Sequence, residues 1–196
     1  MKQILQILGA ALILIIFASV AAGGNLEEGL EAFNSGDFNK AYELYLIEAK
    51  KGNAIAQTNL GTLFALGKGV PQDEKEAAQW FRKSAAQGEV IAQSNLGVYY
   101  ARGQGVAKDD KEAAKWFTLA AKQGDSLSQL SLAIMYDVGR GVTQNRVIAW
   151  AWYALARGNG EGTAQNFIEI LQQAMSPDEI NMAKLTAEQF RSEIGN

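Results

Sequence analysis

Cysteine and histidine are both absent from the 196 residues of the sequence. Tetrahedral zinc sites are built from these two residues, thiolate nucleophiles need the first, and the commonest acid–base relays need the second. These kinds of site are therefore excluded. The lack of cysteine also excludes disulfides and the lipid attachment point of a bacterial lipoprotein. It does not identify the redox compartment, because disulfides are permitted outside the cytosol rather than required there.

Strong charge of one sign is missing too. The formal net charge is −3, and the 18 lysine and arginine residues form no concentrated run. Nucleic-acid binding needs a basic face that displaces counterions, so we expect no nucleic-acid partner. Hydrophobic residues make up 48% of the chain, which is enough for a sizeable core. The length fits one ordinary domain together with a targeting segment.

Residues 1–22 have the features of a signal peptide. Lys2 supplies positive charge, Ile7 to Val20 is apolar or small throughout, and Ser19-Val20-Ala21 offers the small residues that a signal peptidase inspects. We expect cleavage directly after this stretch. The alternative is an uncleaved signal anchor, because residues 4–22 are almost long enough to span a bilayer. Both forms predict an exported protein, either in the periplasm or outside the cell, or anchored to the inner membrane through residues 4–22.

Beyond this segment the sequence repeats at a fixed interval of 36 residues. The interval separates Trp80, Trp116 and Trp152, and also the three copies of a Gly-x-Gly-Val motif that begins at Gly67. Such a period is typical of stacked copies of one supersecondary unit, and apolar residues three and four apart predict helices within each copy. We predict an all-α fold, an α-solenoid of stacked antiparallel helix pairs. The solenoid, residues 25–196, divides into an N-terminal helix pair at 26–53, repeats at 54–89, 90–125 and 126–161, and a C-terminal cap at 162–196.

The recurring glycines, acids and tryptophans are explained by structure. The first glycine of each Gly-x-Gly suits a left-handed helix end and the second a sharp turn, whereas a phosphate-binding loop would need a preceding strand. Asp73 and Asp109 are each followed three residues later by a glutamate, which predicts capping boxes rather than glycosidase carboxylates. Gly61, inside a helix, is expected to allow close packing. The tryptophans are expected in the core.

Together these residues resemble the Sel1-like repeat, a relative of the tetratricopeptide repeat. The pattern is Ala56-Gln57-x-x-Leu60-Gly61, Gly67-x-Gly69-Val70, Asp73, Lys75-Glu76-Ala77-Ala78-x-Trp80-Phe81 and Ala85-Ala86-x-Gly88. The resemblance extends from Leu26 to Phe190, and the third copy is looser, with Ala133 in place of glycine and Asn145 in place of aspartate. It implies a curved solenoid whose concave groove is lined by the first helix of each pair, and an adaptor that binds a protein or peptide partner.

By this resemblance, one row of first-helix positions faces the groove. We expect Ile134, Val138 and Ile170 to form an apolar floor, with Arg102 and Asp137 orienting the bound segment. The alternative is that the C-terminal helix folds back over these apolar residues, because a binding groove and a packed cap use the same residue types. Positions that differ between copies, such as 58, 94 and 130, are expected to select the partner. The predicted partner-binding residues are Thr58, Thr62, Leu66, Ser94, Val98, Arg102, Leu130, Ile134, Asp137, Val138, Asn166 and Ile170.

The leading prediction is a non-catalytic, exported, monomeric adaptor without cofactor or metal, which serves cell-envelope signalling, assembly or secretion. Two alternatives remain. Some cysteine-rich exported relatives are associated with penicillin binding and weak β-lactam hydrolysis, but their cysteine pattern is missing here. A membrane-anchored structural spacer would need residues 4–22 to be retained.

Overall fold

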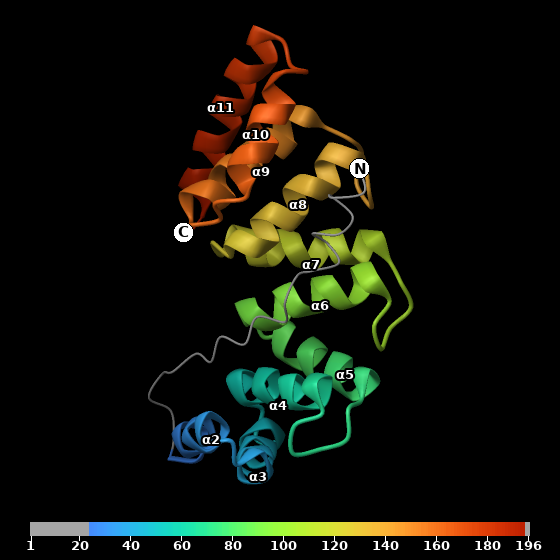
Figure 1. Cartoon of the computed structure of the whole chain (residues 1–196), viewed down its shortest axis with the longest axis vertical. Helices are drawn as coiled ribbons and strands as arrows, with labels where there is room; N and C mark the ends of the chain where they lie inside the picture. The colour runs from blue at the N-terminus through green and yellow to red at the C-terminus, as the bar shows by residue number, and fades with distance from the viewer. Residues whose placement is uncertain (1–23, 195–196) are drawn as a thin grey trace. The chain divides into compact units, whose positions relative to one another are not determined.

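The computed structural model describes residues 24–194, and every regular element in that range is an α-helix (Figure 1). The prediction of an all-α chain is therefore confirmed. The predicted signal segment, residues 1–22, lies outside the described residues. In chain order the helices are α2 (Gly24–Ser35), α3 (Phe38–Lys50), α4 (Ala54–Leu66), α5 (Glu74–Ala85), α6 (Val90–Arg102), α7 (Asp110–Lys122), α8 (Ser126–Val138), α9 (Arg146–Gly158), α10 (Ala164–Gln172) and α11 (Pro177–Glu193).

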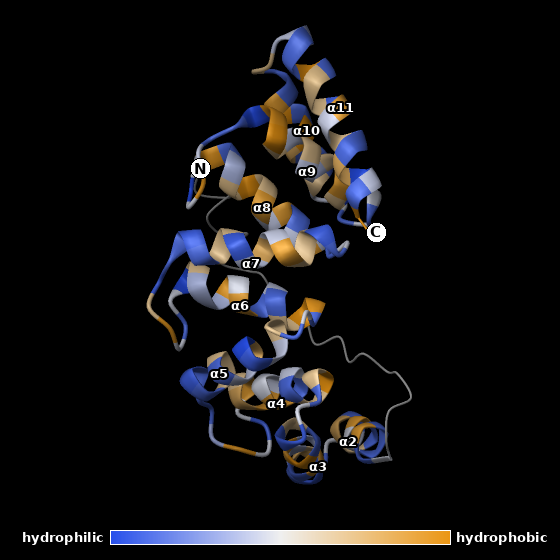
Figure 2. Ribbon diagram, turned by 180° about the vertical axis from the view of Figure 1, so that it is seen from behind, coloured by the Kyte–Doolittle hydropathy of each residue, from blue (hydrophilic) through white to orange (hydrophobic). Residues whose placement is uncertain are grey.

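The described chain divides into two compact units, residues 24–108 and residues 109–194. In the first unit, consecutive helices pack against each other from α2 to α6. In the second unit, α7 packs against α8 and α8 against α9, and α9 also contacts both α10 and α11. Figure 2 shows apolar and polar residues interspersed along the helices, as expected for helices that bury one side. Each unit is thus a stack of neighbouring helices, which is the packing that a solenoid requires.

Acidic side chains begin the second helices of the repeats, although the predicted capping boxes form only in part. Asp73 Oδ1 accepts from the backbone N–H groups of the second and third residues of α5 at 2.9 and 3.1 Å, and Asp109 does the same for α7 at the same distances. The return bond expected from Glu76 and Glu112 is not made within the described chain. Their carboxylates accept instead from the side chains three residues later, Gln79 at 3.5 Å and Lys115 at 3.3 Å. A reciprocal capping box begins α11.

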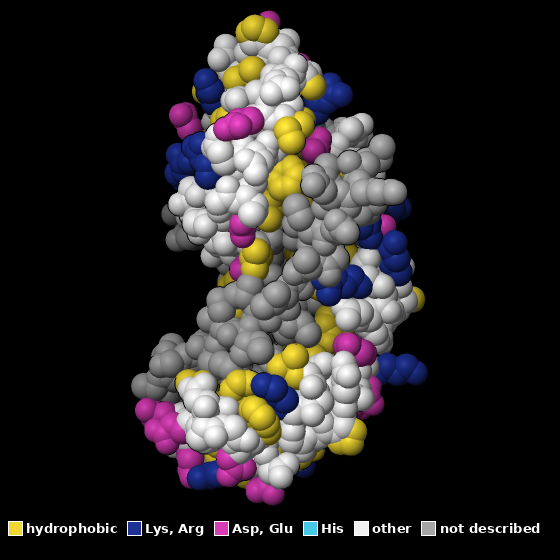
Figure 3. All heavy atoms as spheres, viewed as in Figure 1, with side chains coloured by type: hydrophobic (Ala, Val, Ile, Leu, Met, Phe, Trp, Pro, Cys, Tyr) yellow, Lys and Arg dark blue, Asp and Glu magenta, His cyan; other side chains and the backbone are white. Residues whose placement is uncertain are grey.

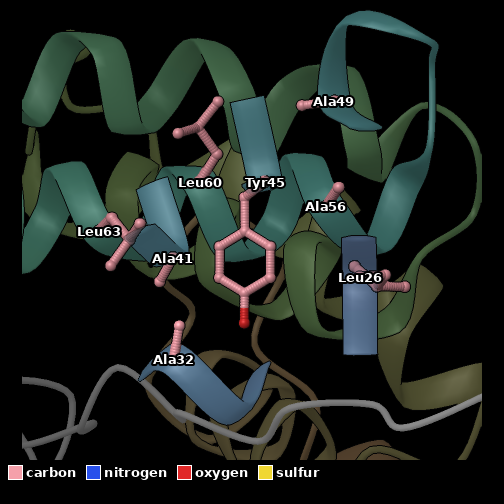
Figure 4. Close-up of a cluster of buried hydrophobic side chains, with 8 residues drawn as sticks. All are labelled: Leu26, Ala32, Ala41, Tyr45, Ala49, Ala56, Leu60 and Leu63. Carbon is pink, nitrogen blue, oxygen red and sulfur yellow. The ribbon is translucent and has the colours of Figure 1, made fainter. Parts of the chain in front are cut away.

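The core of the first unit is built around one tyrosine. Tyr45, on α3, is fully buried among small and aliphatic side chains from α2, α3 and α4 (Figure 4). Its ring leaves no room for a side chain on α2, because a Cβ added at Gly29 would lie 2.7 Å from a ring carbon. The other buried members are Leu26, Ala32, Ala41, Ala49, Ala56, Leu60 and Leu63.

Gly61 allows close packing between the first and second helices of a repeat. The tryptophans at the 36-residue interval differ in how far they are buried. A Cβ at Gly61 on α4 would lie 2.9 Å from the ring of Phe81 on α5, so the predicted packing role of this glycine is confirmed. Trp152 is 3% exposed and belongs to the core, as predicted. Trp80 and Trp116 are only half-buried, and Trp80 packs at the edge of the core.

Candidate partner-binding surface

The loops between first and second helices carry the repeated glycines, and the fold uses both of them. Gly67, Gly103 and Gly139 end their helices in the left-handed conformation. The second glycine also has positive φ and lies directly against the start of the preceding second helix. An added Cβ at Gly105 would collide with the backbone carbonyl of Glu74, and equivalent collisions occur at the other two loops. The predicted structural role of the Gly-x-Gly motif is confirmed.

The residue between the two glycines joins one repeat to the one before it. In each copy its side chain meets the first residue of the preceding second helix. The contact is a cation–π contact, a hydrogen bond or an ion pair, depending on the copy. Contacts between neighbouring repeats therefore explain why the residue between the two glycines varies. The three pairs are Lys68 with its ammonium 4.5 Å from the ring centre of Phe38, Gln104 donating to Glu74 Oε1 at 3.5 Å, and Arg140 with Asp110 Oδ1 at 2.7 Å.

Buried glutamines form a second recurring link, which sequence reasoning missed. Gln129 on α8 is 0% exposed; its amide donates to the Ala121 carbonyl at 3.0 Å, and its oxygen accepts from Asn159 at 2.9 Å. Gln57 makes the equivalent pair of bonds, to the Ala49 carbonyl at 3.1 Å and from Gln87 at 2.8 Å. A buried amide with both ends satisfied stabilises the stack. The signal in the sequence was glutamine at 57, 93, 129 and 165, again at the 36-residue interval.

The predicted partner-binding residues fall into three groups by exposure. They lie on the first-position helices, which are α4, α6, α8 and α10. Thr58, Thr62, Ser94, Leu130 and Ile134 are buried. Leu66, Val98, Arg102 and Asp137 are half-buried, whereas Val138, Asn166 and Ile170 are exposed. The role of these residues in binding stays a prediction, and their burial decides which of them a partner can reach.

Thr58 is engaged by the fold itself. Its hydroxyl lies 2.8 Å from Ser84 Oγ on α5 and 3.1 Å from Glu89 Oε2. Ser84 donates to the Ala54 carbonyl at 2.7 Å, and Glu89 accepts from the backbone N–H of Ala92 to cap α6. Thr58 therefore joins α4, α5 and α6, and this network explains why a hydroxyl is present here.

The predicted apolar floor needs a correction at Ile134. This residue is 1% exposed, and Leu130, one turn earlier, is 4% exposed. Every residue from Ser128 to Met135 is buried, because α8 packs against both α7 and α9. Of the three residues expected in the floor, only Val138 at 42% and Ile170 at 65% reach the surface.

Asp137 also has an internal role. It is half-buried, and its Oδ2 accepts from the Tyr153 hydroxyl on α9 at 3.5 Å. The Tyr153 ring is stacked on Phe167 of α10, with ring centres 5.1 Å apart. Burial raises the pKa of the Asp137 carboxyl, and the Tyr153 hydrogen bond and the charge of Arg146 oppose that rise. Asp137 thus belongs to a contact that links α8, α9 and α10.

The C-terminal helix does not cover the exposed apolar residues. It packs against α9, where the rings of Trp152 and Phe190 are stacked with centres 4.6 Å apart. Val138 and Ile170 remain exposed in its presence. The alternative of a covering C-terminal helix is therefore wrong for these two residues.

An acidic hollow lies at the turn between α2 and α3. Figure 3 shows acidic side chains gathered over this end of the first unit. The hollow has a volume of 330 Å³. The Lys40 ammonium lies 2.7 Å from Glu28, and this pairing raises the pKa of Lys40. Part of the charge is thus compensated within the hollow. Its lining residues are Glu28, Glu31, Ala32, Ser35, Asp37 and Lys40.

Two further properties concern the described residues alone. Residues 24–194 contain no group of three or more Asp or Glu side chains arranged to hold a metal ion. None of the helices α2 to α11 combines the length and the apolar character needed to cross a membrane.

Comparison with known proteins gives one family. The family model described as Sel1 repeat matches residues 24–53, 54–89, 90–125 and 126–167. The chain is similar to the crystal structure of a Sel1 repeat protein from Oxalobacter formigenes, with 30% identity and a TM-score of 0.71 over 74% of this chain and 59% of that chain. It is also similar to c5321, a protective antigen of uropathogenic Escherichia coli strains displaying an SLR fold. For that protein the identity is 30% and the TM-score 0.60, over 79% of this chain and 41% of that chain. The chain thus spans less than two thirds of either neighbour, and no match was found among curated proteins.

Proposed function

Because the chain belongs to the Sel1 repeat family, we propose that it is a non-catalytic scaffold that binds a protein or peptide segment on its first-position helices. The observation that carries this proposal is the exposure of Val138 and Ile170, at 42% and 65%. Val138 ends α8 and Ile170 lies on α10, and both helices pack against α9. Exposed aliphatic side chains on a repeat scaffold favour contact with a partner.

The binding surface that we propose consists of Val138, Asn166 and Ile170, named here the α8–α10 surface. Asn166 and Ile170 are four residues apart on α10, so their side chains lie on the same side of that helix. Asn166 can donate and accept hydrogen bonds, and the two aliphatic residues can bury apolar side chains of the segment. Such a combination suits an extended or helical segment with apolar residues and a polar backbone group within reach.

The engagement of polar side chains in the fold supports a non-catalytic role. Thr58 and Glu89 are hydrogen-bonded to each other, and Asp137 is bonded to Tyr153. A catalytic site needs convergent polar groups that are available to a substrate. These groups instead join neighbouring helices.

We also propose that the protein is exported, on the basis of residues 1–22. The features that support this are the positive N-terminus, the apolar stretch and the small residues that follow it. The mass of the mature protein isolated from its native host tests the proposal. Loss of the first 21 or 22 residues supports a secreted scaffold, retention supports an anchored one, and a cytoplasmic full-length protein contradicts export.

Capture of natural partners with a C-terminal tag tests the α8–α10 surface. Val138→Glu and Ile170→Glu place a charge where an apolar contact is proposed, so the amount of each captured partner should fall at least about tenfold. Leu185→Glu is the matched control, because Leu185 is 67% exposed but lies on α11. Circular dichroism should give the same helical content for all variants. If Val138→Glu and Ile170→Glu capture the same partners as the original protein, the proposed surface is wrong.

A further inference from the structure

The contact between α11 and α9 shows how a further helix docks on the second helix of a repeat. We call the second helices, α3, α5, α7 and α9, the second-position helices, and the side of α9 that carries Trp152 its outer side. On α11 the buried residues are Ala183 and Ala187, one turn apart, and Phe190 follows three residues later and stacks on Trp152. Small residues one turn apart allow two helices to approach closely. On α9, Trp152 and Leu155 are each only 3% exposed. The sequence of α11 therefore indicates what kind of helix this side of a repeat accepts.

The equivalent side of α7 is open. Trp116 and Leu119 stand 36 residues before Trp152 and Leu155. Leu119 is 41% exposed where Leu155 is 3% exposed, and Trp116 is half-buried where Trp152 is buried. The additional helix that α9 contacts, beyond its neighbours α8 and α10, is α11. The lower exposure on α9 therefore coincides with the docking of α11, whose Phe190 stacks on Trp152.

The other second-position helices lack this combination. On α5 the equivalent of Leu119 is Lys83, whose ammonium lies 4.1 Å from the ring centre of Trp80. A lysine therefore covers the aromatic ring there. On α3, Ile47 is 46% exposed, but Leu44 stands in the tryptophan position. Among α3, α5, α7 and α9, α7 alone presents a half-buried tryptophan beside an exposed leucine.

Three lysines flank the open side of α7 along one edge, and Glu112 lies on that side one turn before Trp116. Lys115 and Lys122 lie one turn before and one turn after Leu119, and Lys111 lies one turn before Lys115; all three are exposed. Lys115 is 5.7 Å from the centre of the Trp116 ring and pairs with Glu112 at 3.3 Å. On α9 the three equivalent positions are uncharged, with valine, alanine and glycine at 147, 151 and 158. A helix that docks on α7 therefore meets a basic rim that α11 does not meet on α9.

We propose that the outer side of α7, formed by Trp116 and Leu119 with their rim of lysines, binds an amphipathic helix of a partner protein. The partner helix carries two small residues one turn apart, an aromatic residue three positions after the second, and acidic residues along its edges. The partner is not a second copy of this chain, because the docking side of α11 is already buried against α9. This inference rests on the proposed scaffold function but uses a surface separate from the α8–α10 surface.

A peptide derived from α11 tests the proposal. The probe is a fluorescent peptide of residues 176–194 carrying Lys184→Glu and Arg191→Glu, which keeps the docking residues and makes the edges acidic. Fluorescence anisotropy with the full protein should show binding that weakens as salt is added, because the lysine rim contributes. Leu119→Lys should weaken binding at least about tenfold and Lys115→Glu about threefold. The control is Leu185→Lys in the protein, on the exposed side of its own α11, and it should leave binding of the peptide unchanged.

Three outcomes overturn the proposal. The first is no binding at millimolar concentrations of the protein. The second is binding that Leu119→Lys leaves unchanged, which would mean that the peptide has displaced α11 from α9. The third is self-association of the protein that Leu119→Lys abolishes while the peptide does not bind, which would assign the surface to a second copy.

The two proposals can fail separately. Partner capture that depends on Val138 together with failure of the peptide would refute this inference and leave the proposed function standing. Peptide binding through Leu119 with capture that is indifferent to Val138 would refute the α8–α10 surface alone.

Discussion

Two nitrogens of Arg140 converge on one carboxylate oxygen of Asp110, with Nη2 at 2.7 Å and Nε at 2.8 Å. The pair ties the loop after α8 to the first residue of α7, thirty residues earlier in the chain. Both side chains are largely shielded, with 19% and 28% of their surface exposed. A charged pair in this setting is stronger than one on an open surface, because water competes less for it.

Loss of this pair should destabilise the protein measurably. Arg140→Ala leaves the Asp110 carboxylate without its guanidinium, and we expect a loss of about 1–2 kcal/mol in the free energy of unfolding. Urea denaturation measures the change. The control is Gln104→Ala, which removes only a 3.5 Å contact to Glu74 at the equivalent position and should cost about 0.5 kcal/mol or less. Equal losses in the two variants would contradict the stronger role assigned to Arg140.

The second glycine of a loop should tolerate no side chain. Gly105→Ala combines a positive φ of 62° with a collision against the Glu74 backbone, and we expect a cost of about 3 kcal/mol or more. Gly88→Ala separates the two effects, because Gly88 has a φ of 91° but no atom within 4 Å of the added Cβ. Its cost should be about 1 kcal/mol from the backbone conformation alone. Thermal unfolding of the two variants compares them directly, and similar melting temperatures would refute the collision.

Gln129, which is fully buried, should matter more for stability than Gln165, its half-buried equivalent. Gln129→Met keeps the size of the side chain but leaves the Ala121 carbonyl and the Asn159 amide without this partner, so we expect a loss of about 2 kcal/mol. Gln165→Met is the matched control, since Gln165 also accepts from one group, Arg157, and donates to another, Glu169, but both bonds are exposed to water, so their loss should cost about 0.5 kcal/mol. Chemical denaturation gives both values. A neutral Gln129→Met would show that the amide bonds add nothing to the stack.

The half-buried carboxyl of Asp137 should make stability depend on pH. Its pKa is raised above the ordinary value of 3.8, mainly by burial, so the folded protein holds this proton at pH values where the unfolded chain has lost it. Stability should therefore fall as the pH rises from about 3.8 through the raised pKa. Asp137→Asn removes the cost of burying the charge while its oxygen can still accept from Tyr153. The variant should melt at a higher temperature than the original protein at pH 7, with a smaller difference near pH 4. A lower melting temperature at pH 7 would show that the attraction to Arg146 outweighs burial.

Periodicity predicted the scaffold well because its determinants are local. A glycine at a left-handed helix end and an aspartate at a helix start act within a few residues, so their spacing carries the information. The packing role of Gly61 was predictable because glycine inside a helix is less favourable than alanine, so its presence indicates a need for close packing. The reciprocal capping bond is absent at Glu76 and Glu112, whose carboxylates accept from Gln79 and Lys115 one turn later, whereas Glu179 makes this bond at α11.

Which of the predicted partner-binding residues are exposed could not be predicted in the same way, because exposure depends on neighbours distant in sequence. Thr58 and Leu130 occupy equivalent positions and both are buried, although one is polar and one apolar. The difference follows the second helix, where Ser84 faces the Thr58 hydroxyl and the equivalent position after Leu130 holds Ala156. The docking of α11 on α9 had no counterpart in the repeat pattern, so the burial of Trp152 relative to Trp116 was also beyond the reach of the period.

The links between the paired glycines and the preceding helix bear on how such an array can gain or lose copies. Removal of residues 90–125 would bring Arg140 to the place of Gln104, opposite Glu74, where a guanidinium again meets a carboxylate. Removal of residues 54–89 would bring Gln104 opposite Phe38, where an amide replaces the cation that covers the ring. The two deletions shorten the chain equally, yet only the first brings together two side chains that attract each other by charge. Recombination between copies is therefore constrained by one residue per loop, and the repeats are not interchangeable.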